Sequence, residues 1–173
     1  MSSGVAAPVT VSLGGEQDRE AALAVWRAAI GARRAGRPVP PHVEARVRRY
    51  IGEAGAFLVV AREGERLVGM ALGLQGRADD GSGPPLPGLL HISSVYVAPD
   101  RWGRGIGRRM MDAVLAEGLA RGYERTQLWT QADNERALRL YAGRGFRPSG
   151  RSKHDDDLGD RIVHLERDLS TLL

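Results

Sequence analysis

Residues 95–107 read Val95-Tyr96-Val97-Ala98-Pro99-Asp100-Arg101-Trp102-Gly103-Arg104-Gly105-Ile106-Gly107. The apolar start is typical of a strand that stops at Pro99, and the alternate glycines that follow are typical of a tight turn. Ile106, Met110 and Val114 then recur every four residues, which predicts the buried face of a helix that runs to about Gly122. This unit of strand, glycine turn and helix decides the fold.

The glycine turn at 103–107 is suited to holding an anion. Without Cβ atoms, the backbone can adopt unusual dihedral angles and its N–H groups can converge on one point. The helix N-terminus adds partial positive charge, and Arg104, Arg108 and Arg109 add full charges. These features favour a pyrophosphate site, and a turn that needs glycine for packing alone is the alternative. A dinucleotide fingerprint is disfavoured because its third glycine would fall at Arg108.

Upstream of this unit, the sequence predicts two amphipathic helices between short strands. The segment from Gly76 to Gly88 is rich in Gly, Pro and Asp, which indicates a mobile surface loop. The expected elements are a strand at 9–13, a helix ending near Gly36, a helix from Pro40-Pro41 to about Gly55, a hairpin of 57–60 with 67–72, and a strand at 89–97.

Downstream, the pattern predicts a strand at 126–131, a helix at 134–144, a strand at 146–150 and a closing strand at 161–166. The polar segment 152–160 between the last two strands reads as a hairpin tip. Residues 1–7 read as a frayed end, and no internal repeat or second domain is evident. We therefore expect one domain over residues 1–173, of the mixed α/β class.

The composition excludes several kinds of chemistry. The chain of 173 residues has 25 basic and 21 acidic residues, a formal net charge of +4, and no Cys. A disulfide framework, a thiolate nucleophile and a Cys-ligated metal are therefore excluded. Lys153 is the single lysine and is followed by His154 instead of Ser or Thr, so a Walker phosphate loop is excluded as well.

Neither a membrane span nor a signal peptide is indicated, because no apolar run reaches 18 residues and no basic-then-apolar start is present. We therefore expect a cytoplasmic protein without a membrane partner. The basic balance alone is weak evidence for nucleic acid, since the arginines alternate with acidic residues instead of forming runs.

Two further segments complete a family pattern, Asn134-Glu135-Arg136-Ala137 and Tyr141-Ala142-Gly143-Arg144-Gly145-Phe146. Together with residues 95–107 they resemble the GNAT superfamily of acetyl-CoA-dependent N-acetyltransferases, and the likeness spans residues 89–150. The resemblance implies a central, mostly antiparallel and splayed sheet flanked by helices. One departure is Trp102, where the family usually has Gln or Arg, so the contribution of this side chain is open while the backbone cradle is expected to remain.

The resemblance implies acetyl-CoA as co-substrate and no metal. Its pantetheine arm would bond to the edge of the strand at Val95 and Val97, and its pyrophosphate to the amides of 103–108. Asn134 would contact the cofactor, although a helix N-cap is the alternative role for it. The implied cofactor-binding residues are Val95, Tyr96, Val97, Trp102, Gly103, Arg104, Gly105, Ile106, Gly107, Arg108, Asn134, Ala137 and Tyr141.

Candidate catalytic residues follow from the same resemblance. Tyr141 matches the family tyrosine whose hydroxyl approaches the thioester sulfur, and a phenol with a pKa of ~10 can donate to a thiolate at neutral pH. A purely structural core role is the alternative. Strand alternation places His91, Ser93, Val95 and Val97 on one face. His91 would then serve as base and Ser93 would hold a relay water, with a structural histidine as the alternative.

The expected reaction is direct transfer to a primary amine, of a small molecule or a peptide, because no Cys exists to carry the acetyl group. The acidic residues at 79–80, 155–157 and 160 would attract a cationic amine, but solvated loop charges are the favoured interpretation. A homodimer through the last strand is compatible with the sequence. The alternative functions are a catalytically silent CoA-binding module and, less favoured, an Arg-rich nucleic-acid-binding domain.

Overall fold

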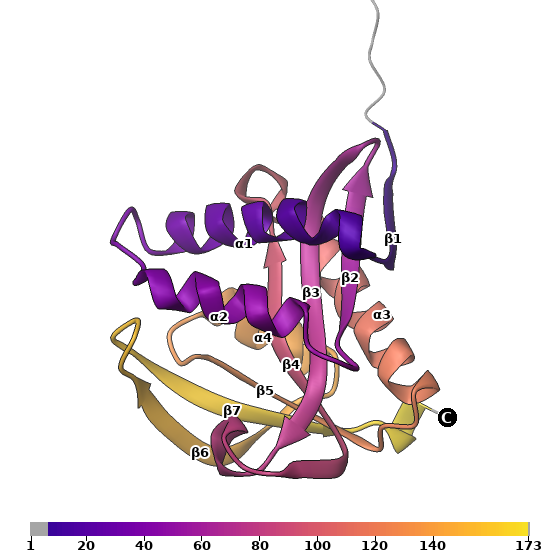
Figure 1. Cartoon of the computed structure of the whole chain (residues 1–173), viewed down its shortest axis with the longest axis vertical. Coiled ribbons are helices and arrows are strands. Elements are labelled where there is room, and N and C mark those ends of the chain that lie inside the picture. Colours follow the sequence, from indigo (N-terminus) through magenta and orange to yellow (C-terminus); the bar gives the residue numbers. More distant parts are fainter. Residues whose placement is uncertain (1–6, 173) are drawn as a thin grey trace, which may run out of the picture.

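The computed structural model describes residues 7–172 and shows one seven-stranded sheet flanked by helices (Figure 1). The frayed end expected at residues 1–7 lies outside the described residues except for Ala7. The sheet order is β1-β2-β3-β4-β5-β7-β6. The elements are β1 (Val9–Leu13), α1 (Arg19–Arg33), α2 (Pro41–Ile51), β2 (Phe57–Glu63), β3 (Arg66–Arg77), β4 (Pro85–Val97), α3 (Ile106–Ala120), β5 (Arg125–Gln131), α4 (Glu135–Gly143), β6 (Arg147–Asp155) and β7 (Asp160–Asp168).

Two apolar layers hold the helices against the sheet. In β2, Leu58 and Val60 pack in the cluster formed with α1 and α2, whereas Val59 and Ala61 pack in the cluster formed with α3. Successive side chains of a strand point to opposite faces, so the continuous apolar runs of β2 and β3 are buried on both sides. Figure 1 shows α1 and α2 crossing one face of these strands and α3 on the other.

The sheet splays between β4 and β5, as the family resemblance predicted. These two strands are parallel and pair only from Leu89 with Arg125 to Ile92 with Leu128. All other neighbouring strands in the described sheet are antiparallel. Beyond Ile92 the edge of β4 that faces β5 has no strand partner, which leaves main-chain groups available for a ligand.

A β-bulge at Ser93 corrects one sequence expectation. The register between β3 and β4 passes from Gly73 opposite Ile92 to Leu72 opposite Ser94, so Ser93 is an extra residue. The alternation of faces therefore reverses there, and the prediction of one shared face from residue 91 to residue 97 was wrong. Val95 and Val97 pack with Ile92 in the α3 cluster, while His91 falls on the Tyr96 face.

Several strands are longer than the sequence predicted. β3 runs to Arg77 and β4 begins at Pro85, so the loop expected at 76–88 is reduced to 78–84, and its mobility stays a prediction. The hairpin tip shrinks to 156–159 for the same reason: main-chain pairing continues through polar residues whose side chains face solvent. The final strand, β7, lies between β5 and β6 and does not form the sheet edge. None of the described helices has the length and apolar character needed to cross a bilayer.

Candidate active site

A cleft of about 490 Å³, counting its open mouth, lies where β4 and β5 separate. We call it the first cleft. It brings together residues from β4, β5 and α4 that are far apart in the sequence, as well as Arg33 from α1. Six of the predicted site residues line it: Ser93, Val95, Tyr96, Asn134, Ala137 and Tyr141. His91 is not among the lining residues.

The glycine turn leads directly into α3 and has the backbone conformation expected of an anion cradle. Gly103 and Gly105 adopt positive φ angles of 78° and 76°, and Gly105 is the left-handed N-cap of α3. No side chain in the described part of the chain caps this helix, so the first amides of α3, which have no intrahelical partner, remain available. A Cβ added at either glycine would meet open space, so nothing in the described fold fills the cradle.

The arginines around this turn divide into two groups. Arg104 and Arg108 are exposed beside the glycines. Arg109 instead donates from Nη1 to the carbonyl oxygen of Val9 at 2.9 Å, so it helps hold β1 against α3. Two of the three cations expected for a pyrophosphate therefore have no side-chain partner within residues 7–172 and can turn toward it, while the third is engaged elsewhere.

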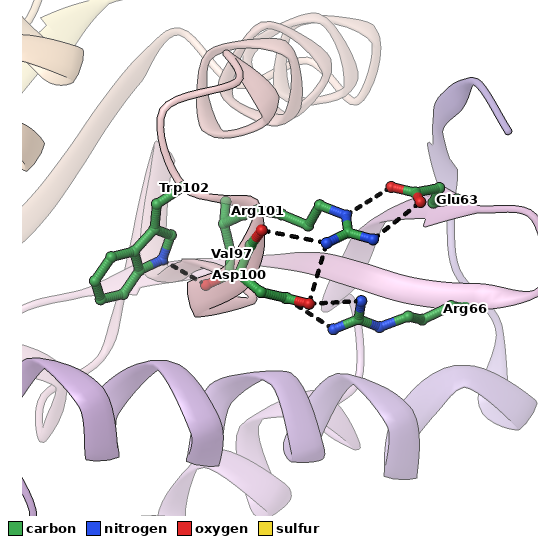
Figure 2. Close-up of polar contacts among 6 residues, drawn as sticks. All are labelled: Glu63, Arg66, Val97, Asp100, Arg101 and Trp102. Carbon is green, nitrogen blue, oxygen red and sulfur yellow. Dashed lines mark hydrogen bonds and ion pairs between the residues drawn. The ribbon is translucent and has the colours of Figure 1, made fainter. Parts of the chain in front are cut away.

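Ion pairs anchor the segment before the glycines to the β2–β3 hairpin (Figure 2). Arg101 donates to both carboxylate oxygens of Glu63, at 2.7 and 3.0 Å, and Arg66 donates to both of Asp100, at 2.9 and 3.0 Å. These hydrogen bonds lower the pKa of Glu63 and of Asp100. Bidentate pairs fix direction as well as distance, so they orient the turn. Arg101 points away from the cradle as a result.

Trp102 has a specific role that the sequence left open. Its indole N–H donates to the carbonyl oxygen of Val97 at 2.8 Å (Figure 2). The guanidinium of Arg136 lies 5.4 Å from the centre of its ring. The side chain is 41% exposed. The indole therefore forms a hydrogen bond with the carbonyl of Val97, a β4 residue that the resemblance predicts to bind the pantetheine arm.

Asn134 and Ala137 open α4 at the rim of the first cleft. The Asn134 side-chain oxygen accepts a hydrogen bond from the Ala137 amide at 3.2 Å. The N-cap interpretation of Asn134 is therefore confirmed, while its contact with a cofactor stays a prediction. Tyr141 lies about two turns after Asn134 on the same helix and lines the same cleft.

Tyr141 combines a core position with access to the first cleft. It is 7% exposed, packs edge-to-face against Phe146 with ring centres 6.0 Å apart, and still lines the cleft. Burial, with a smaller contribution from Tyr96, raises the pKa of the Tyr141 hydroxyl above its usual value of ~10. The phenol thus stays protonated at neutral pH and can only donate a hydrogen bond to a nascent thiolate.

His91 belongs to a polar chain across the sheet that sequence reasoning missed. His91 Nδ1 lies 3.5 Å from Gln127 Nε2, Gln127 Oε1 lies 2.8 Å from His164 Nε2, and His164 Nδ1 lies 2.7 Å from the Ser149 hydroxyl. Burial, followed by the charges of His164 and Lys153, lowers the pKa of His91 to about 4. His91 is therefore a weak base at neutral pH, and its catalytic role stays a prediction.

Two of the acidic loop residues, Asp80 and Asp157, are engaged in ion pairs within the fold. Asp157 contacts His42 at 2.6 Å and Arg46 at 3.0 Å, which lowers the pKa of its carboxyl. Asp80 pairs with Arg151 at 2.7 Å and Lys153 at 3.5 Å. These pairs support the structural interpretation of the loop charges over a field that attracts a cationic amine. Among residues 7–172, no group of three or more His, Asp or Glu side chains is placed to hold a metal ion.

Comparisons with known proteins agree with this geometry. The sequence profile of the Acetyltransferase (GNAT) family matches residues 21–146. An uncharacterized N-acetyltransferase from Mycobacterium tuberculosis is 30% identical over 106 residues, which cover 61% of this chain and 62% of that protein. The chain therefore spans about three fifths of the length of this curated relative.

Solved structures share the fold at low sequence identity. An N-acetyltransferase from Staphylococcus aureus superposes with a TM-score of 0.72 at 20% identity, covering 94% of this chain and 99% of that one. An N-acetyltransferase from Thermoplasma acidophilum in complex with coenzyme A gives a TM-score of 0.68 at 14% identity, covering 93% and 99%. With the splayed sheet, the glycine cradle and a family profile that covers most of the sequence, the chain belongs to the GNAT family of acetyltransferases.

Proposed function

We propose that the protein transfers the acetyl group of acetyl-CoA to a primary amine by direct attack while both substrates are bound. One observation carries this proposal: the first cleft opens where β4 and β5 separate, and Tyr141 lines it beside a β4 edge that leads to the glycine cradle. Acetyl-CoA supplies an activated thioester, and the chain supplies the means to hold and align it.

The residues present suit the parts of acetyl-CoA. The pyrophosphate fits the amides at the start of α3, because they point away from the helix without a capping side chain, and Arg104 and Arg108 stand exposed nearby. The pantetheine amides fit the unpaired edge of β4 at Val95 and Val97. The carbonyl oxygen of Val97 already accepts a hydrogen bond from the indole of Trp102. The indole would have to break this bond before a pantetheine amide could donate to the same lone pair.

Acetyl transfer in the first cleft requires that the thioester carbonyl oxygen be stabilised as it gains negative charge and that the CoA sulfur leave. The amine nitrogen forms a bond to the thioester carbon, and the carbon–sulfur bond breaks to release the CoA thiolate. The amine gives its proton to water, and the thiolate takes a proton from water after it leaves. Main-chain amides of β4 beyond Ile92 have no partner on β5 and can donate to the carbonyl oxygen. Tyr141 can donate to the departing sulfur, and Ser93 lines the cleft where a relay water would serve.

The test is calorimetric binding of acetyl-CoA, followed by a screen of amines with detection of the free thiol of CoA. Because the chain has no Cys, the thiol signal comes from the product alone. Binding of acetyl-CoA with amine-dependent thiol release supports the proposal. Binding without transfer to any amine would identify a silent CoA-binding module instead. DNA binding that weakens with salt, without any heat on adding acetyl-CoA, would favour the nucleic-acid alternative.

A further inference from the structure

A second cleft of about 420 Å³ adjoins the first one. Arg33, Tyr96 and Gln131 line both clefts, so the two spaces share a wall. The second cleft lies at the C-terminal end of α1 and extends to Leu158 in the β6–β7 turn and to Asp160 at the start of β7. The two clefts are therefore neighbours, separated by no more than the side chains that line both of them.

Three arginines and two aspartates carry the charge of the second cleft. Arg34 is only 8% exposed and donates to the carbonyl oxygens of Pro38 and Leu158, each at 3.1 Å, so it fixes the shape of the cleft wall. Its Nε is buried without a hydrogen-bond partner among residues 7–172. Arg37 donates from Nε to the carbonyl of Arg34 at 3.1 Å. Arg37 thus satisfies the carbonyl of the C-cap residue of α1, and the positive charges of the three arginines offset the negative end of the α1 dipole, which would otherwise oppose an anion.

The aspartates do not cancel this positive charge. Asp160 lies 3.9 Å from Arg34, at the limit of an ion pair. Asp133 contacts Arg33 at 2.9 Å, but its side chain is 81% exposed. An exposed ion pair of this kind contributes little, so an anionic ligand can take its place on Arg33. Arg37 is exposed and forms no ion pair within the described part of the chain.

Among the described residues, Arg33 is also the single charged side chain that lines the first cleft. A guanidinium at this position repels an ammonium ion and attracts an anion. Of the loop carboxylates that would favour a cationic amine, Asp157 is paired with His42 and Arg46, and Asp80 is paired with Arg151 and Lys153. The electrostatics of the two clefts therefore favour an acceptor with negative charge beside its amine.

We propose that the acceptor is a primary amine that also carries a carboxylate, with the carboxylate held by Arg33 and Arg37 in the second cleft and the amine in the first. This inference rests on the proposed acetyl transfer and specifies its substrate class. Planar guanidinium groups match a carboxylate through paired N–H donors, so the carboxylate fixes the distance and direction of the amine.

The experiment compares straight-chain ω-amino acids, from glycine through β-alanine to longer homologues, each with its own neutral amide. The measurement is kcat/KM from release of free CoA thiol. We expect at least one acid to be preferred over its amide by about tenfold or more. Arg33→Gln and Arg37→Gln should each reduce this preference by about tenfold, and Arg33→Glu should reverse it toward diamines.

Arg19→Gln is the matched control, because Arg19 is a partly exposed arginine at the opposite end of the same helix. It should leave the acid-to-amide ratio unchanged. The inference would be overturned if the parent protein acetylated the amides as well as their acids. It would also be overturned if Arg33→Gln left the acid-to-amide ratio unchanged. In both cases the proposed acetyl transfer would stand. If the protein binds acetyl-CoA but acetylates none of the amines tested, the proposed function and this inference are overturned together.

Discussion

Replacing Tyr141 by Phe removes a single hydroxyl from the wall of the first cleft. The ring keeps its edge-to-face contact with Phe146 and its place in the core. No hydrogen bond from this hydroxyl to a described residue is formed, so its loss leaves no partner unsatisfied. We expect the free energy of unfolding to change by less than about 1 kcal/mol.

The catalytic cost follows from what the hydroxyl can donate. Burial raises the pKa of Tyr141 above ~10, whereas a free thiol has a pKa of ~8.5, so the proton is shared with the leaving sulfur and not fully transferred. A hydrogen bond to a charged group contributes about 1.5–3 kcal/mol. Tyr141→Phe should therefore lower kcat by roughly 10-fold to 150-fold.

The assay is steady-state release of CoA thiol with several accepted amines, together with calorimetric binding of acetyl-CoA. Cofactor affinity should stay near that of the parent, because the hydroxyl acts on the departing sulfur. Tyr123→Phe is the control: Tyr123 packs against the same core cluster but does not line the first cleft. An unchanged kcat for Tyr141→Phe across these amines would refute the role of the hydroxyl.

Three further predictions concern the cradle, His91 and acid stability. Gly105→Ala and Gly122→Ala both place Ala at a positive φ, 76° and 86°, so each should lower the stability of the fold by a similar ~1–2 kcal/mol. Only Gly105→Ala should also weaken the binding of acetyl-CoA measured by calorimetry. Equal losses of affinity in the two variants would contradict the cradle. His91→Ala should leave the acidic limb of the kcat/KM profile in place, because the pKa of His91 is about 4, whereas a displaced limb would restore His91 as the base. Arginine partners lower the pKa of Asp18, Glu63 and Asp100 in the folded protein, so the stability they contribute is present above about pH 4 and is lost as the pH falls further. Denaturant unfolding from about pH 6 to about pH 3 measures this loss, and a constant midpoint would count against these pairs.

Local patterns predicted most elements because their causes are local. The glycine turn, the helix face at Ile106, Met110 and Val114, and the Asn134 cap depend on neighbours within a few residues, and each is present in the structure. Alternation along β4 failed at Ser93 because a bulge is set by the register with β3, which no local pattern encodes.

The amino-acid sequence by itself determined the fold class, the family and the cradle at the start of α3, since these depend on residue types at fixed short spacings. Only the tertiary structure decided the rest. Long-range pairing brings β5 beside β4 for four residues and then separates them, which creates the first cleft. The same packing sets Gln127 between His91 and His164, and places Arg33 where two clefts meet, through contacts between residues from distant parts of the chain.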